Sequence, residues 1–258
     1  MKLQGVQLDT DTKVWESELV RAQQVHTGFF PTHIPVINGI EIFAESRAAF
    51  HIGGDYYDFL CHNGKQLTFT IGDVCNKGVS AALVMAVIHK VLQTSVKVLH
   101  APSPKDVLAY SNRDMYDELS RISMFATCFI GQFDVASRSL RYANAGHSPV
   151  LYFPADKPAQ FLPADSVPLG VLPQSTFINQ ELSLAPGDLL VVATDGMVEW
   201  SEFTEKPYGY MQLTQRIEQV RHQSIQTVAQ TLFDMADRCA TPPLNHDDRT
   251  LLILRGVD

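Results

Sequence analysis

The chain has 258 residues, of which 45% are hydrophobic and 19% are charged, a balance typical of a soluble globular protein rather than of a disordered chain. Its net charge of -8, from 20 Lys and Arg against 28 Asp and Glu, argues against a general nucleic-acid binder, because phosphate backbones require a basic face. The four cysteines form no CxxC pair, so neither a zinc site nor a disulfide framework is indicated.

The N-terminus lacks a basic segment followed by an apolar run. No stretch of the sequence approaches the roughly 18 apolar residues of a membrane span. We therefore expect a cytoplasmic protein without a membrane span.

The first part of the chain reads as a lead-in helix. Four apolar side chains recur there near helical spacing: Trp15, Leu19, Ala22 and Val25. The pattern predicts a helix over 12–30 that ends before Pro31, because the residue before proline disfavours helical backbone. Two interpretations remain open, a helix that packs onto the domain and a connector that carries a signal or dimerises.

Strands and helices follow in groups. Apolar runs predict strands at 39–44, 55–61, 66–71, 126–134, 139–145, 150–153, 177–184, 188–194 and 250–255. An Asn-Gly turn within 62–65 predicts that the second and third strands pair as a hairpin. Helices are predicted at 79–99, at 103–121 with Ser103 as its cap and Pro104 in its first turn, and at 210–221 and 225–238.

The order of these elements is strands, helix pair, strands, helix pair, strand. Because strands are grouped rather than alternating with helices, the pattern favours an α+β layered sandwich over a doubly wound parallel sheet. The Pro-containing stretch 154–173 is predicted to be an insertion loop.

Several aspartates stand where an apolar strand begins or ends. The segments are GGDYYDF with Asp55 and Asp58, LTFTIGD with Asp73, LLVVATDG with Asp195, and NHDDRTLLIL with Asp247 and Asp248. Ionised carboxylates at the rim of a core are costly to desolvate. We therefore expect a cation beside them.

A metal ion suits these acids better than basic side chains, because only Lys77 and Arg249 lie next to them in the sequence. Oxygen ligands without clustered His or Cys favour Mg²⁺ or Mn²⁺ over zinc, and shared carboxylates suit two ions about 3.5 to 4 Å apart. A single Asp-Gly is typical of an ordinary turn. The four segments together favour a metal site.

An ordered series of motifs resembles the bacterial PPM (PP2C-like) phosphatases of the SpoIIE/RsbU type. The motifs are AQQVHTGFFPTHIP (22–35), GGDYYDF (53–59), IGDVCNKGVSAALVMA (71–86), FATCFIGQFD (125–134), LRYANAGHSPVLY (140–152), PLGV (168–171), GDLLVVATDGMVE (187–199) and DDRTLLIL (247–254). They run in the family's order from about Ala22 to the C-terminus.

The resemblance implies a PP2C-like four-layer α/β/β/α sandwich of two mainly antiparallel sheets flanked by helices. A lead-in or linker helix would occupy 1–30 and the phosphatase domain 31–258. Two or more Mn²⁺ or Mg²⁺ ions would lie between loops at one edge of the sheets.

The resemblance also assigns roles. Asp73 is expected to bridge two ions, the Val74 backbone carbonyl to ligate one, Asp195 and Asp247 to hold the other, and Asp55 to act directly or through bound water. The catalytic role of Asp73 and Asp195 would run through a metal-activated water whose hydroxide attacks phosphorus in line, without a covalent phosphoenzyme.

Two positions surround these expected ligands. Asp248 stands where related enzymes often carry Asn, and with Gly196 it is expected to lie just behind the ligands. Asn76 departs from the family pattern Asp-Val-x-Gly-His/Lys-Gly, in which glycine holds that place. Asn tolerates left-handed backbone, so the loop is expected to survive.

The resemblance implies that the substrate is phosphoserine or phosphothreonine on a regulatory protein such as an anti-sigma-factor antagonist. A regulatory partner, or a homodimer formed through the N-terminal helix, is a further expectation. Two alternatives stay open. One is a pseudophosphatase or binding module that keeps the fold, and the other is a two-metal hydrolase of small phosphoesters.

Three polar residues allow two interpretations each. His147 could protonate the leaving serine oxygen, but a turn histidine with a structural hydrogen bond is favoured. Arg47 could contact substrate phosphate or lie solvated at an edge strand. Lys77 could face the phosphate or water.

Overall fold

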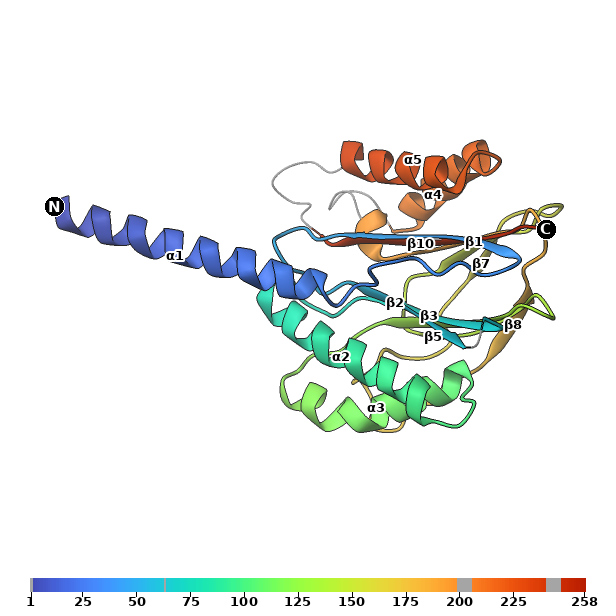
Figure 1. Cartoon of the computed structure of the whole chain (residues 1–258), viewed down its shortest axis with the longest axis horizontal. Helices are drawn as coiled ribbons and strands as arrows, with labels where there is room; N and C mark the ends of the chain where they lie inside the picture. Colours follow the sequence, from blue (N-terminus) through green and yellow to red (C-terminus); the bar gives the residue numbers. More distant parts are fainter. Residues whose placement is uncertain (1, 63, 199–205, 240–246) are drawn as a thin grey trace.

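Two antiparallel sheets packed face to face form the centre of the fold, and a pair of helices covers the outer face of each (Figure 1). The structure is a computed structural model that describes residues 2–62, 64–198, 206–239 and 247–258. Its layers run α/β/β/α. This confirms the predicted fold class.

One sheet has the order β1-β10-β9-β6-β7. Its strands are β1 (Ile40–Arg47), β10 (Arg249–Gly256), β9 (Leu189–Ala193), β6 (Val150–Phe153) and β7 (Gln160–Leu162). The first and last strands of the domain, β1 and β10, pair along all eight residues from Ile40↔Gly256 to Arg47↔Arg249. This pairing closes the domain, because it joins its two ends in one sheet.

The other sheet has the order β2-β3-β4-β5-β8. Its strands are β2 (Tyr56–His62), β3 (Gln66–Gly72), β4 (Cys128–Asp134), β5 (Ser139–Ala145) and β8 (Gln180–Ser183). The pairing of β2 with β3 confirms the predicted hairpin, although Asn63 of its turn lies outside the described residues. Gly64 in that turn has φ +66°, which suits a hairpin turn.

Helices α2 (Val79–Val98) and α3 (Pro104–Arg121) cover the β2-to-β8 sheet, and α4 (Lys206–Val220) and α5 (Ile225–Cys239) cover the other. Ser103 caps α3 as predicted, with its backbone N–H donating to the Asp106 carboxylate at 3.0 Å. A third apolar cluster fills the space between the sheets. Strands are therefore buried on both faces, which explains why β9 reads as an unbroken apolar run.

The prediction of an insertion loop at 154–173 was wrong in one respect. It contains β7, a three-residue strand that pairs with β6 at the edge of the sheet. So short a strand, in a stretch rich in proline, leaves too few residues for a period-2 pattern to be detected.

Helix α2 corrects the expectation that no segment comes near the composition of a membrane span. It has a mean hydropathy of 1.5 over 18 residues. Among the described helices, it alone is long and apolar enough to cross a membrane. Half of that window is buried inside the fold, where α2 packs on α3 and β2. A core helix of a globular protein has this same composition.

Helix α1 (Lys2–Thr27) starts earlier than predicted and projects away from the sandwich (Figure 1). At 1.5 Å per residue it is about 39 Å long. Trp15 and Val25 are exposed, so the interpretation in which the whole apolar face packs onto the domain is wrong for them. The buried side chain of His26 anchors the C-terminal end of the helix to the domain.

Candidate functional site

The fold brings the strand-end aspartates to one edge of both sheets. Asp73 follows β3 and Asp55 precedes β2, while Asp195 opens the short helix η1 (Asp195–Met197) after β9 and Asp247 precedes β10. Because β2 pairs with β3 and β9 pairs with β10 antiparallel, these strand ends meet. Residues far apart in the sequence therefore face one another.

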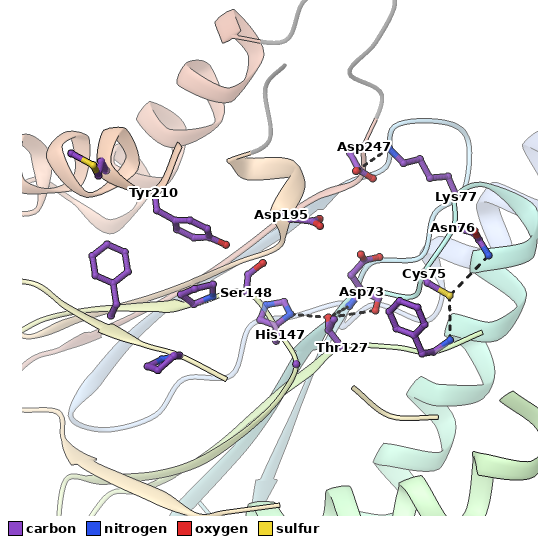
Figure 2. Close-up of a pocket in the computed structure, with 16 residues that line it drawn as sticks. Asp73, Cys75, Asn76, Lys77, Thr127, His147, Ser148, Asp195, Tyr210 and Asp247 are labelled. Carbon is purple, nitrogen blue, oxygen red and sulfur yellow. Dashed lines mark hydrogen bonds and ion pairs between the residues drawn. The ribbon is translucent and has the colours of Figure 1, made fainter. Parts of the chain in front are cut away.

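A cavity of about 1020 Å³ opens at this edge (Figure 2). Its lining comprises Asp73, Cys75, Asn76, Lys77, Phe125, Thr127, Gly146, His147, Ser148, Pro149, Phe161, Pro163, Asp195, Tyr210, Met211 and Asp247. Three of the five predicted carboxylates are in this set. Asp55 and Asp248 lie behind the lining.

The carboxyl of Asp73 lies where a negative charge is unfavourable. Burial, and then the negative charges of Asp195, Asp247 and Asp248, raise the pKa of its carboxyl to about 8. Its backbone N–H donates to Thr127 Oγ1 at 3.1 Å, which fixes the start of the loop after β3. A cation placed here would relieve the repulsion.

Asp55 is held from beneath by two threonine hydroxyls. Thr194 Oγ1 and Thr250 Oγ1 donate to its Oδ2 at 2.8 and 2.6 Å. Burial above all, and then the charges of Asp73 and Asp248, raise the pKa of Asp55 well above its usual range. The two threonines oppose that rise, and they fix the carboxylate at the floor of the site.

Asp248 positions the glycine-rich loop before β2. Its Oδ1 accepts the Ala49 N–H at 2.8 Å and its Oδ2 accepts the Gly54 N–H at 2.7 Å. A Cβ at Gly53 would collide with this carboxylate, and one at Gly196 would collide with the Asp248 carbonyl oxygen. Both glycines therefore allow the close packing of loops at this edge.

Gly54 leaves a gap beside two oxygen atoms. A Cβ built there would lie 2.8 Å from the Val74 carbonyl oxygen and 3.2 Å from Asp73 Oδ1. The absence of a side chain at this position thus keeps open the place where these two oxygens come together.

Lys77 carries a positive charge into the cavity. Its Nζ lies 2.9 Å from Asp247 Oδ2 (Figure 2), so this lysine faces a carboxylate rather than water alone. The preceding residue, Asn76, has φ 71°, which confirms the left-handed backbone expected for that departure from the family pattern.

His147 is buried and neutral. Burial lowers the pKa of its ring to about 4, and its Nδ1 lies 3.0 Å from Thr127 Oγ1. Its backbone N–H donates to Asn144 Oδ1. A ring that stays neutral at pH 7 is a poor proton donor, so the structural interpretation fits.

Arg47 and Asp58 lie outside the cavity in the described part of the chain. The Arg47 guanidinium lies 2.7 Å from Glu45, and its carbon stacks 3.8 Å from the centre of the Phe233 ring. Asp58 Oδ2 accepts from Gln93 Nε2 at 3.2 Å and joins β2 to α2. Neither residue forms part of the candidate site.

The described residues contain no cluster of three or more His, Cys, Asp or Glu side chains that would enclose a cation by themselves. Three of the aspartates, Asp73, Asp195 and Asp247, instead line an open cavity. Ions such as Mg²⁺ keep several water ligands and take only one or two carboxylates each.

Sequence reasoning missed the threonines and the apolar part of the lining. Thr127, Thr194 and Thr250 stand at strand ends, where threonine is a common strand former and gives no separate signal. Their side chains nevertheless fix Asp73 and Asp55. Thr194 directly before Asp195 was the one clue in the sequence.

Comparison with known proteins identifies the family of this chain. The family model described as Stage II sporulation protein E (SpoIIE) matches residues 63–256. The chain belongs to the SpoIIE family. Membership confirms the resemblance seen in the motifs, and it fits the arrangement of acids at one edge of the sandwich.

Two curated relatives of this SpoIIE-family chain differ in how much of them it covers. "Phosphoserine phosphatase RsbU" of Bacillus subtilis is 29% identical over 258 residues, which span 98% of this chain and 72% of RsbU. "Protein IcfG" of Synechocystis is 28% identical over 224 residues, which span 78% of this chain and 35% of IcfG. The chain thus spans about a third of IcfG.

Among solved structures, the SiaA-PP2C domain of Pseudomonas aeruginosa superposes with a TM-score of 0.81. It is 18% identical in sequence and covers 95% of this chain, with 98% of that domain matched. This similarity confirms the PP2C fold. RsbU is named a phosphoserine phosphatase, which agrees with the enzyme class expected from the sequence, protein serine/threonine phosphatase.

Proposed function

We propose that the chain is a metal-dependent protein serine/threonine phosphatase that acts on a phosphorylated regulatory protein. The observation that carries the proposal is that Asp73, Asp195 and Asp247 line one cavity. Burial, and then the charges of Asp195, Asp247 and Asp248, raise the pKa of Asp73 there to about 8. Carboxylates crowded in this way favour a bound cation. Membership of the SpoIIE family supports the same activity.

The residues at the site fit Mg²⁺ or Mn²⁺. All the candidate donors are oxygens, which hard cations prefer. The gap at Gly54 leaves room beside the Val74 carbonyl and Asp73 Oδ1. Lys77 already places a positive charge against Asp247, where a metal ion would lie.

Five residues would hold two or more ions in this proposal. Asp73 would bridge, the Val74 carbonyl would ligate one ion, Asp195 and Asp247 would ligate the other, and Asp55 would act directly or through water. Asp248 and Gly196 support them from behind, through the loop contacts described above. When bound, the ions would supply an activated water for attack on phosphorus and neutralise charge on the phosphoryl oxygens.

The chain's own residues prepare the site for that chemistry. Thr194 and Thr250 keep Asp55 in place, and Thr127 fixes the backbone of Asp73. Lys77 adds a charge that suits an entering phosphate. His147 remains neutral and stabilises the loop next to Thr127.

The test is phosphate release from a phosphoserine protein, with Mn²⁺ and with chelator. We expect turnover only with Mn²⁺. Asp195→Asn should reduce this turnover by at least about 100-fold, because the metal ion loses a carboxylate ligand. Asp156→Asn is the matched control, since Asp156 is exposed and lies outside the cavity. Equal turnover in chelator and in Mn²⁺ would rule out the metal mechanism.

The same assay separates the alternatives. Release from small phosphoesters alone would favour a two-metal hydrolase of small molecules. Binding of a phosphoprotein without any turnover would favour a pseudophosphatase.

We further propose that residues 31–258 form a cytoplasmic phosphatase domain and that the segment 1–30 connects it to a regulatory partner or a second copy. The exposed apolar side chains of α1 support this role. They are Val14, Trp15, Val20 and Val25. A helix with such residues along its free length can pair with another helix.

A further inference from the structure

The cavity beside the aspartates has two chemically different sides. Figure 2 shows Tyr210 on one side and Asp247 with Lys77 on the other. Three other apolar lining residues are grouped with Tyr210: Phe161 meets its ring, Met211 follows it in the chain, and Pro163 stands two residues after Phe161. These four residues are called the apolar wall below. A further apolar lining residue, Phe125, lies apart from this group beside Cys75.

The apolar wall comes from two separate elements. Phe161 lies in β7 at the edge of its sheet, and Met211 follows Tyr210 in α4. The rings of Phe161 and Tyr210 meet edge to face, with centroids 6.4 Å apart and planes at 81°. Tyr210 lies on the buried face of α4, and its ring packs against Phe161.

Three members of the wall, Phe161, Pro163 and Met211, are exposed to solvent. Phe161 is 47% exposed and Met211 is 55% exposed. Exposed apolar side chains that gather at a cavity mark a surface on which a ligand or protein binds. A phosphoryl group is polar and gains nothing from such a surface. The wall therefore suits a part of the substrate other than its phosphate.

The size of the cavity agrees with a larger occupant. Its volume of about 1020 Å³ lies at the upper end of pockets that enclose whole small molecules, about 300 to 1000 Å³. The wall and the aspartates share this one cavity. A substrate whose phosphate lies at Asp73 and Asp195 would bring the residues beside its phosphoserine against the wall.

We propose that the apolar wall binds a large apolar side chain next to the phosphoserine of a protein substrate. This inference rests on the proposed phosphatase function, since it places the phosphate at the aspartates. It defines the substrate class as phosphoserine segments with a flanking residue such as Leu, Ile or Phe. A segment with only small polar neighbours would be hydrolysed less efficiently.

The test compares phosphoserine peptides that differ in one residue, Leu or Ser, placed on either side of the phosphoserine. With Mn²⁺, kcat/KM of the wild type should be about tenfold higher for Leu than for Ser at one position. Phe161→Ala and Met211→Ala should each bring this ratio toward one, mainly through KM. Leu172→Ala should keep it, because Leu172 is also 47% exposed and lies off the cavity.

The outcomes are distinct. Equal kcat/KM for Leu and Ser at every position in the wild type, or a ratio that both wall variants keep, would overturn the inference. If neither the peptides nor p-nitrophenyl phosphate is hydrolysed, the phosphatase proposal fails. Fluorescence anisotropy then tests whether the apolar wall binds the flanking side chain. Tighter binding of Leu peptides to the wild type than to Phe161→Ala supports the inference, and equal binding overturns it. Thermal unfolding of each variant verifies its fold.

Discussion

At the scale of single residues, Lys77 gives the candidate site a positive charge of its own. Its Nζ lies 2.9 Å from Asp247 Oδ2, and the pair is partly exposed. In the proposed site, a metal ion that took the same Asp247 oxygen would displace this ammonium group. The lysine would then compete with the metal, and once displaced it would be available to a substrate phosphate.

Lys77→Gln is expected to tighten Mn²⁺ binding by roughly two- to fivefold, the range expected for a solvent-screened ion pair. Calorimetric titration of Mn²⁺ into chelator-treated protein measures this change. Lys90→Gln is the control, since Lys90 is an exposed lysine of α2 outside the cavity. Weaker binding to Lys77→Gln than to the control would show that Lys77 does not compete.

The residues of the site were predictable to different extents. Aspartates at strand ends stand out, because burying an ionised acid beside an apolar run is costly unless a cation or hydrogen bonds compensate it. The left-handed backbone of Asn76 followed from its residue type. The contact between Lys77 and Asp247 could not be foreseen, since it joins residues 170 positions apart through tertiary packing.

At the scale of elements, the end of α1 is attached to the loop that carries Asp55. His26 Nε2 lies 3.0 Å from the Gly53 carbonyl oxygen, and its ring meets Phe30 edge to face at 5.4 Å. The next residue, Gly54, donates its N–H to Asp248. The position of the helix is thus linked to the floor of the cavity through two hydrogen bonds.

His26→Ala is expected to weaken Mn²⁺ binding severalfold and to lower the free energy of unfolding by about 1 kcal/mol, the typical value of one hydrogen bond. His26→Gln should restore both, because an amide can reach the same carbonyl. Titration with Mn²⁺ and urea unfolding measure the two effects, with the exposed His33→Ala as control. Unchanged Mn²⁺ affinity in His26→Ala would show that the helix end does not position the loop.

Elements with a strong period were predictable, and short or isolated ones were not. The bounds of β5 and β6 match the prediction, since β6 is a continuous apolar run and apolar residues alternate with polar ones at the start of β5. β7 gave no signal, and the free length of α1 could not be told from a packed helix because both carry apolar residues at helical spacing. The apolar wall forms where β7 meets α4, so the sequence alone did not predict it either.

At the scale of the whole molecule, the grouping of strands and helices predicted an α+β layered sandwich, and the resemblance to PP2C-like phosphatases implied its four layers. The grouping could not show which helix pair covers which sheet, because that depends on pairings such as β1 with β10 at opposite ends of the chain. The same pairings gather the aspartates at one edge. The fold therefore concentrates negative charge in one place, and stability should depend on pH.

In the metal-free protein, stability should fall as pH rises from about 4 to about 8. The pKa of Asp73 is about 8 in the fold, against an ordinary value of 3.8, so the folded state binds more protons than the unfolded state throughout this window. The charges of Asp195, Asp247 and Asp248 cause the rise together with burial. Urea unfolding in chelator should show a loss on the order of a few kcal/mol, which Mn²⁺ should diminish. Asp73→Asn should reduce the loss, leaving the part due to the buried Asp55, and Asp156→Asn should keep it. A free energy of unfolding that increases over this window would contradict a cluster of carboxylates in need of a cation.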